Sequence, residues 1–241
     1  MAWLSLFRSS PERQIQRLRK KVKEPHGDPS VRQNAAQKLF EMGTPEALSA
    51  LLDRFTISVS PSVLDEQEKE QVYNWLVELG ERAVPALVEF LKRERAVHWP
   101  AKALQAILDP ERQAREFAAL LSYLWDHPPA TAIPKAQLIR ALGDLWSEEL
   151  DRAVRRFLQD DDDDVRLAAV HYLMERSEEA GRDDVIRCYL DSEDRPRIRN
   201  QILEYFAERG WSVRGHRPAV EETLPSGFSL TRDGKVRRVG P

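Results

Sequence analysis

The chain has 241 residues, of which 32% are charged, and its formal net charge is −3. No run approaches the roughly 18 apolar residues of a transmembrane helix, and the opening MAWLSLFR is too short for a signal peptide and has its basic residue in the wrong place. The one cysteine, Cys188, allows no intrachain disulfide, which is typical of a reducing compartment. The sequence therefore predicts a cytoplasmic protein.

The first 24 residues are predicted to form a capping helix. This segment is basic, because it holds seven basic and two acidic residues. Ile15, Leu18 and Val22 fall on one face of the segment 11–22, so this face should cover the unit that follows. Residues 195–241 are also basic, with ten basic and five acidic residues, so the negative charge lies between the two ends. The candidate terminal basic surface comprises Arg17, Lys20, Lys21, Arg237 and Arg238.

The extreme N-terminus supports a second interpretation of the same region. Trp3, Leu4, Leu6 and Phe7 form an apolar cluster directly before the basic helix. An aromatic wedge followed by a basic helix is the pattern of an interfacial membrane anchor. Peripheral membrane contact is therefore the alternative to a simple solvated cap.

A phrase of 13 residues recurs over 31–43, 165–177 and 198–210. In each copy an arginine stands second, and apolar residues open the phrase and recur every four residues. These apolar residues are Val31, Ala35, Leu39; Val165, Ala169, Leu173; and Ile198, Ile202, Phe206. Weaker units fall into the same frame at Glu68, Val72, Leu76; Pro100, Leu104, Leu108; and Pro134, Leu138, Leu142. One such unit cannot bury its apolar stripe alone, so the repetition predicts an α-solenoid over residues 25–210, with about six helix pairs.

Each unit should contain a second helix after the repeated phrase. Apolar spacing predicts these helices over 45–55, 82–94, 111–124, 147–158 and 183–190. Gly43, Gly80 and Gly210 stand where first helices should end, and Asp28 and Asp164 stand where an N-cap is expected. The segment 55–63 lacks a helical period and is predicted to be a long loop between units.

The repeated phrase resembles the first helix of HEAT repeats, in the compact form of bacterial HEAT-like proteins. Asp28, Val31, Arg32, Ala35 and Leu39 carry the pattern in the first unit. The fifth unit carries it on Asp164, Val165, Arg166, Ala169 and Leu173. This resemblance implies a two-layer stack of helix pairs and leaves the function open, because one fold serves many functions.

Residues 211–241 are predicted to form a C-terminal cap or tail. The segment 217–224 can form a short helix, and Asp233-Gly234 between two β-prone runs indicates a hairpin. The alternation of side chains does not select one register, so an extended tail is the alternative. The predicted fold class is all-α, with a capping helix at one end and a short β-hairpin or extended tail at the other.

No motif for catalysis or metal binding stands out, so we expect a protein without enzymatic activity and without a cofactor. No two histidines lie three or four residues apart; they are His26, His98, His127, His171 and His216. None is followed by glutamate, whereas the iron-binding HEAT-like hydroxylases use His-Glu dipeptides. The run 160–164 lacks the glycine and distant glutamate of a calcium loop, and Cys188 lies on an apolar stripe that predicts burial.

The sequence predicts a scaffold or adaptor that binds a protein partner of unknown identity. The candidate contact is a stripe of arginines on the polar faces of two second helices: Arg112, Arg115, Arg152, Arg155 and Arg156. The alternative is a nucleic-acid-binding protein similar to HEAT-like DNA glycosylases, which would use this stripe as a basic groove. The acidic body disfavours it, and Trp125 and Trp146 at the ends of apolar stripes are expected to belong to the core.

Overall fold

The computed structural model describes residues 10–176 and 178–239, and the chain divides into two compact units, Met1–Gln113 and Ala114–Pro241. Within these residues helices make up most of the regular structure, and the strands form one short hairpin. The predicted all-α solenoid class with a C-terminal hairpin is confirmed. The apolar cluster of Trp3, Leu4, Leu6 and Phe7 lies outside the described residues.

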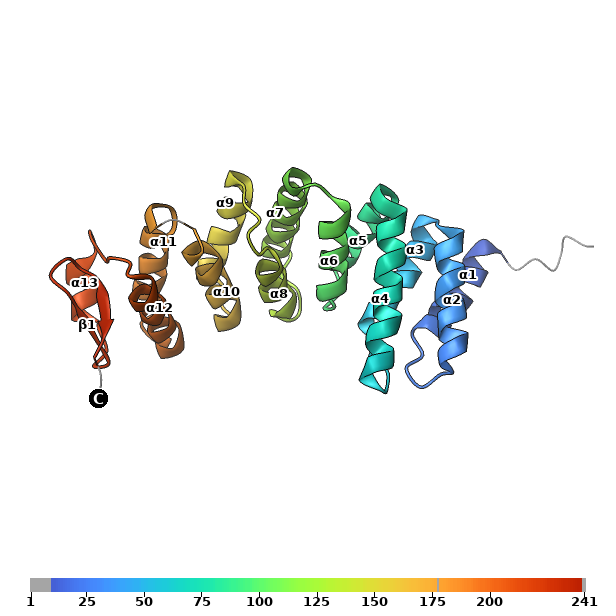
Figure 1. Cartoon of the computed structure of the whole chain (residues 1–241), viewed down its shortest axis with the longest axis horizontal. Coiled ribbons are helices and arrows are strands. Elements are labelled where there is room, and N and C mark those ends of the chain that lie inside the picture. Colours follow the sequence, from blue (N-terminus) through green and yellow to red (C-terminus); the bar gives the residue numbers. More distant parts are fainter. Residues whose placement is uncertain (1–9, 177, 240–241) are drawn as a thin grey trace, which may run out of the picture. The chain divides into compact units, whose positions relative to one another are not determined.

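In the first unit, two layers of helices follow a capping helix. First helices α2, α4 and α6 pack side by side, and second helices α3 and α5 pack against each other (Figure 1). The elements are α1 Pro11–Val22, α2 Pro29–Met42, α3 Pro45–Leu52, the 3-10 helix η1 Asp53–Thr56, α4 Ser62–Leu79, the 3-10 helix η2 Gly80–Ala83, α5 Val84–Leu91 and α6 His98–Ile107. Helix α1 covers α2 and α3 with Ile15, Leu18 and Val22 buried, which confirms the predicted cap.

In the second unit, first helices α8, α10 and α12 pack one against the next. Helix α7 Pro110–Asp126 runs into this unit and is followed by α8 Ile133–Ala141, α9 Glu148–Arg156, the 3-10 helix η3 Phe157–Gln159, α10 Asp163–Met174, α11 Glu178–Leu190, α12 Pro196–Arg209 and α13 Arg217–Glu222. The core between the layers is apolar and includes Phe117, Phe157 and Phe206, each at most 1% exposed.

The repeat frame predicted from the sequence is confirmed except at one position. Seventeen of its eighteen residues are buried, including Glu68 in the second unit of the frame. Val31 is the exception and is 43% exposed. The first turn of α2 instead directs Arg32 inward, where it binds Glu68, and this leaves Val31 at the surface.

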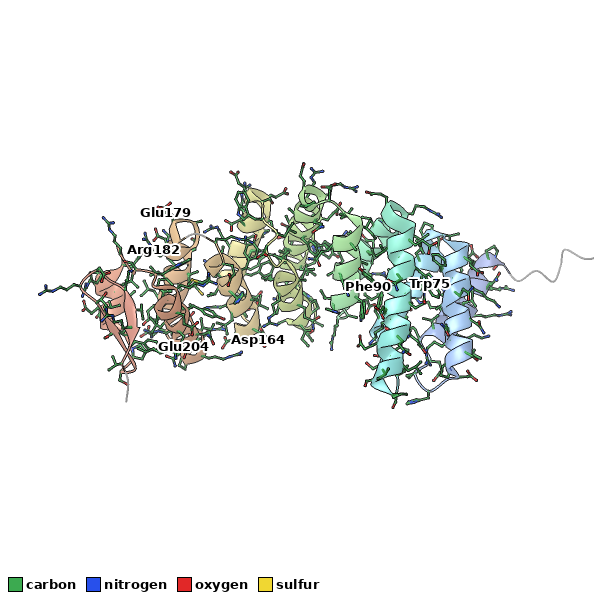
Figure 2. The ribbon with its side chains drawn as sticks, viewed as in Figure 1. Trp75, Phe90, Asp164, Glu179, Arg182 and Glu204 are labelled. Carbon is green, nitrogen blue, oxygen red and sulfur yellow. The ribbon has the colours of Figure 1, made fainter. Side chains whose placement is uncertain are left out.

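Helix ends follow the predicted capping chemistry at most positions. Asp28 accepts a hydrogen bond from the Ser30 amide at 2.7 Å, and Gly43 and Gly210 end α2 and α12 in the left-handed conformation. Asp164 was expected to be the N-cap of α10, and this is wrong. Asp162 is the cap, since its side chain accepts from the amides of residues 164 and 165, while Asp164 lies in the first turn (Figure 2).

The predicted loop over 55–63 is shorter than expected. Residues 53–56 form η1, and α4 already begins at Ser62, six residues before the frame position Glu68. In the stretch 62–67 only Val63 and Leu64 are apolar, and Val63 is 66% exposed, so the apolar pattern is too weak to predict this extra length.

The C-terminal hairpin pairs β1 Phe228–Leu230 with β2 Val236–Arg238, and Ser229 lies opposite Arg237. Strand β2 packs against α12 and buries Val236 to 2% exposure. The amide of Val213 donates to the Gly234 carbonyl at 2.8 Å, which ties the turn to the segment after α12. The hairpin therefore closes the last unit, as a marginal two-stranded sheet must have something to pack on.

Candidate functional site

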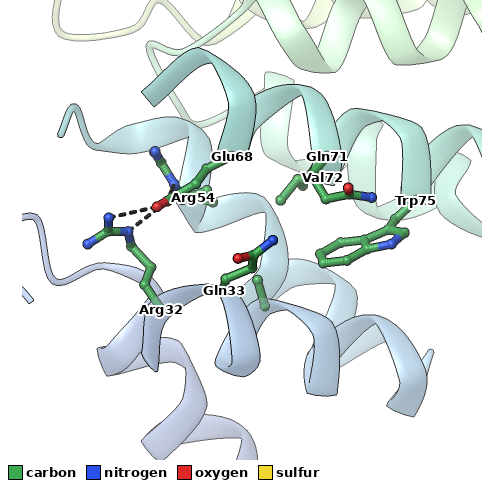
Figure 3. Close-up of a pocket in the computed structure, with 8 residues that line it drawn as sticks. Arg32, Gln33, Arg54, Glu68, Gln71, Val72 and Trp75 are labelled. Carbon is green, nitrogen blue, oxygen red and sulfur yellow. Dashed lines mark hydrogen bonds and ion pairs between the residues drawn. The ribbon is translucent and has the colours of Figure 1, made fainter. Parts of the chain in front are cut away.

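A buried cluster of charges joins the first two helix pairs of the first unit. Glu68 Oε2 accepts hydrogen bonds from Arg32 Nε at 2.7 Å and from Arg54 Nε at 2.8 Å (Figure 3). Arg54 also binds Asp65 Oδ1 at 2.7 Å, and Lys69 binds the other oxygen of that carboxylate at 2.6 Å. Arg32 and Arg54 are only 2% and 1% exposed.

This cluster is saturated by the chain itself. Arg32 Nη1 donates to the backbone carbonyls of Glu24 and Gly27, and Arg54 Nη1 donates to the carbonyl of Ile57. The cavity beside it, lined by the Gln33, Gln71 and Trp75 side chains among others, holds about 10 Å³ (Figure 3), which is at most one water molecule. The cluster therefore fastens two units together and offers no room for a ligand.

The two carboxylates of the cluster titrate at lower pH than usual. Burial raises the pKa of Glu68, but the hydrogen bonds and charges of Arg32 and Arg54 outweigh it and hold this pKa below its ordinary value of 4.5. For Asp65, burial is likewise outweighed by Lys69 and Arg54, and its pKa lies below the ordinary 3.8. Both groups thus stay ionised in the folded protein near neutral pH.

We expect this cluster to make stability sensitive to acid. Because the folded pKa values are lowered, the contribution is complete above about pH 4.5 and is lost as the pH falls through the lowered folded values. Urea unfolding at a series of pH values should show the free energy of unfolding falling below pH 4.5, and this fall should be smaller in a Glu68→Gln variant. An identical slope in both proteins would contradict the assignment.

The basic residue at the second position of the repeated phrase has a structural role. In three helix pairs of the second half of the chain, this side chain contacts the segment that follows the second helix of the same pair. Lys135 Nζ binds Asp160 Oδ2 at 2.5 Å, Arg166 Nη1 binds Ser192 Oγ at 3.1 Å, and Arg199 donates to the Thr223 carbonyl. The repetition of this residue reflects the closing of each helix pair.

Three of the five arginines in the predicted stripe form ion pairs with acidic residues of this chain. Arg156 Nη2 binds Asp126 Oδ1 at 3.0 Å and its guanidinium lies 5.0 Å from the centre of the Trp125 ring. Arg155 binds Asp151 at 2.7 Å and also pairs with Asp184 of α11. In the first unit, Arg112 pairs with Glu81.

Two members of the stripe face solvent. Arg115 is exposed on α7, and Arg152 is exposed on α9, on the side away from buried Leu150 and Val154. Arg152 forms no ion pair with any residue that the structure describes. Of the residues predicted on α9, it is therefore the one whose charge is available to a partner.

The terminal basic residues also differ in their surroundings. Arg17, Lys20 and Lys21 are exposed on α1, and Arg237 is exposed on β2. Arg238 lies 3.5 Å from a Glu204 oxygen and 3.4 Å from a Glu208 oxygen of α12. The C-terminal pair is thus partly neutralised by the helix that the hairpin covers.

Trp146 was expected in the core and this is wrong, because it is 56% exposed. It lies in the loop before Ser147, the N-cap of α9. Trp75, Trp99 and Trp125 are half-buried and Trp211 is buried. The position between the turn at Gly143 and a serine N-cap was the signal in the sequence that could have placed Trp146 in a loop.

Other groups that could carry chemistry lie apart from one another. Among residues 10–176 and 178–239 no group of three metal-ligating side chains comes together. Cys188 is buried, and burial raises the pKa of its thiol to about 11, so the nucleophilic thiolate does not form near neutral pH. No helix in the described part is both long and apolar enough to cross a membrane.

Open grooves lie between helices within each of the separate units, and two of them are lined by charged side chains together with an exposed apolar one. The larger, of about 420 Å³, lies in the second unit and is lined by residues before and on α8, including Ile133 and Arg140, and by Asp162 and Asp164. The other, of about 180 Å³, lies between α1 and α2. It is lined by Leu18, Lys21, Val31, Asn34, Ala35 and Lys38.

Comparison with known proteins identifies the repeats. The family model for HEAT repeats matches residues 117–207. No curated protein sequence matches the chain. Human deoxyhypusine hydroxylase in complex with glycerol is a similar solved structure, at 18% identity over 89% of this chain and 91% of that chain, with a TM-score of 0.31. That similarity is too weak to support any statement about activity. The match identifies the helix pairs over residues 117–207 as HEAT repeats, and helix pairs continue on both sides of this segment.

Proposed function

We propose that the chain is a non-catalytic scaffold that binds a partner protein, with a contact centred on Trp146 and Arg152. HEAT repeats form a repeat scaffold, and stacked repeats present extended surfaces suited to such binding. The observation that carries the proposal is the exposure of Trp146, at 56%. Tryptophan and arginine are the side chains that most often dominate the binding energy of protein interfaces.

The two anchors would contact different chemical groups of the partner. Trp146 would bury its ring in an apolar pocket of the partner, and Arg152 would bind a carboxylate there, since a guanidinium forms two parallel hydrogen bonds with such a group. Glu148 and Glu149 are exposed on the same helix, so an acidic partner group must approach Arg152 directly to avoid repulsion. A compact acidic and apolar epitope fits this surface.

The nucleic-acid alternative has less support. It needs several arginines to contact phosphates, and three of the five residues in the stripe, Arg112, Arg155 and Arg156, already pair with carboxylates of this chain. Phosphates would have to displace these carboxylates.

We expect Trp146→Ala and Arg152→Glu each to weaken partner binding by about 30-fold, the effect of losing about 2 kcal/mol at an interface hot spot. The measurement is affinity capture from lysate of the source organism, followed by titration of the captured protein. Substitution of Arg155 or Arg156 is unsuitable here because it would break internal ion pairs.

The matched control is Arg214→Glu, which makes the same charge change at an exposed residue of the same unit. Capture of one nuclease-resistant protein that the control keeps and both variants lose would support the proposal. Capture of nucleic acid alone, or of a protein that both variants bind as well as the wild type, would overturn it.

A further inference from the structure

We propose that the outer face of α1, together with the groove between α1 and α2, binds an anionic lipid surface. Arg13, Arg17, Lys20 and Lys21 follow the spacing i, i+4, i+7, i+8 and so share one face of the helix. All four side chains are exposed, and none pairs with an acidic residue of the described chain. They form a continuous stripe of positive charge, which we call the α1 stripe.

The opposite face of α1 fixes the orientation of this stripe. Ile15, Leu18 and Val22 are buried against α2 and α3, so the helix cannot roll to insert its apolar side into a bilayer. The stripe is consequently held outward at the surface of the first unit. Lipid headgroups would meet it without any change in the fold.

Two other cations, Arg19 on α1 and Lys23 at its C-cap, have an acidic partner within the chain. Arg19 Nε lies 2.5 Å and Lys23 Nζ lies 3.6 Å from Asp53 Oδ2, and this carboxylate is buried. The chain thus supplies an internal carboxylate to Arg19 and Lys23 and supplies none to the α1 stripe. Arg155 and Arg156 in the second unit also have internal partners, so the unpaired stripe stands out within the described residues.

The groove beside the stripe suits the phosphate of a lipid headgroup. Lys21 and Lys38 are exposed at its sides, and Val31, 43% exposed, contributes apolar surface, whereas Ala35 is buried. Its volume of about 180 Å³ accommodates a headgroup. Two ammonium groups beside the groove match the level of the anionic headgroups at a bilayer surface.

The sequence before α1 favours a membrane over an acidic peptide as the occupant. Trp3, Leu4, Leu6 and Phe7 precede the helix, and aromatic side chains prefer the membrane interface. A basic surface or a short apolar segment binds membranes weakly by itself, and the two signals together give stable attachment. An acidic peptide would engage the stripe but would not require these apolar residues.

The test uses the full chain with vesicles of phosphatidylcholine alone and of an equal mixture of phosphatidylcholine and phosphatidylserine. We expect sedimentation with the mixed vesicles only, weakened by high salt. Arg17→Glu/Lys20→Glu/Lys21→Glu should reduce the affinity by about 100-fold, since each cation near an anionic surface contributes about a fivefold factor or more. Trp3→Ala/Phe7→Ala should also release the protein from mixed vesicles.

The control is Arg95→Glu/Arg214→Glu/Arg232→Glu, which changes the net charge equally at exposed residues away from α1. This control should retain vesicle binding, and thermal unfolding followed by circular dichroism should show that both triple variants remain folded. Equal loss in the two triple variants, or equal binding to both kinds of vesicle, would overturn the proposal. Retention of wild-type binding by Trp3→Ala/Phe7→Ala would overturn the lipid assignment in favour of a purely electrostatic partner.

Discussion

Replacing Glu68 with glutamine is expected to lower the free energy of unfolding by about 3–5 kcal/mol, the range found when one member of a buried ion pair is removed. Glu68 accepts from the Nε atoms of both Arg32 and Arg54. Glutamine keeps the shape of the side chain but removes the charge, and its amide nitrogen would confront a guanidinium donor. Arg54 would keep Asp65 as a partner, whereas Arg32 would lose the carboxylate it pairs with. Urea unfolding followed by circular dichroism measures this loss.

The matched control is Glu66→Gln, because Glu66 lies on the same helix and is exposed. This variant loses the same charge without disturbing the cluster, and a change within about 0.5 kcal/mol is expected for a surface site. In a repeat protein the stability of a unit depends on its nearest neighbours, so the effect of Glu68→Gln should fall on unfolding of the first unit. Equal unfolding midpoints for the two variants would mean that the cluster contributes little.

Much of the architecture could be predicted because the burial of each first helix follows a local period. Ile198, Ile202 and Phe206 are each at most 1% exposed, as their spacing required. The extra turns at the start of α4 could not be predicted in this way. Asp65 and Glu68 are buried there through ion pairs with Arg54 and Arg32, and a buried carboxylate leaves no trace in an apolar pattern.

The candidate contact surface was harder to predict, because ion pairs depend on the register between neighbouring helices. The spacing within 147–158 correctly places Arg152, Arg155 and Arg156 on the polar side of a helix. The same spacing does not show that Asp126 of α7 lies close enough to pair with Arg156, or Asp184 of α11 close enough to pair with Arg155. Only the packed structure distinguishes Arg152, which forms no ion pair within the described part of the chain, from Arg155 and Arg156.

The exposed α1 stripe illustrates the opposite case. Its spacing and the burial of Ile15, Leu18 and Val22 could both be predicted from the sequence, because a helix relates them by a fixed geometry. What the sequence could not show is that Arg19 and Lys23 pair with Asp53. That distinction divides the cations of one helix into a structural pair and an outward surface.

Aspartate at position 39 is expected to unfold the first helix pair, whereas aspartate at position 31 should be tolerated. The repeated phrase gives Val31 and Leu39 the same role, and the structure separates them, with exposures of 43% and 0%. Leu39→Asp removes a buried apolar side chain, which lowers the free energy of unfolding by about 2–5 kcal/mol. It also buries an unpaired charge, which costs several kcal/mol more. Val31→Asp places the same charge in water on the same helix.

Thermal and urea unfolding of the two variants therefore distinguish the observed packing from the frame of the sequence. The observed packing predicts loss of the first unit in Leu39→Asp and a change of at most about 1 kcal/mol in Val31→Asp. Equal, severe destabilisation would mean that Val31 is buried in solution and that α2 is rotated relative to its place here. Such a rotation would also withdraw Arg32 from Glu68, so the Glu68→Gln variant would then lose its effect, which ties the two experiments to one helix orientation.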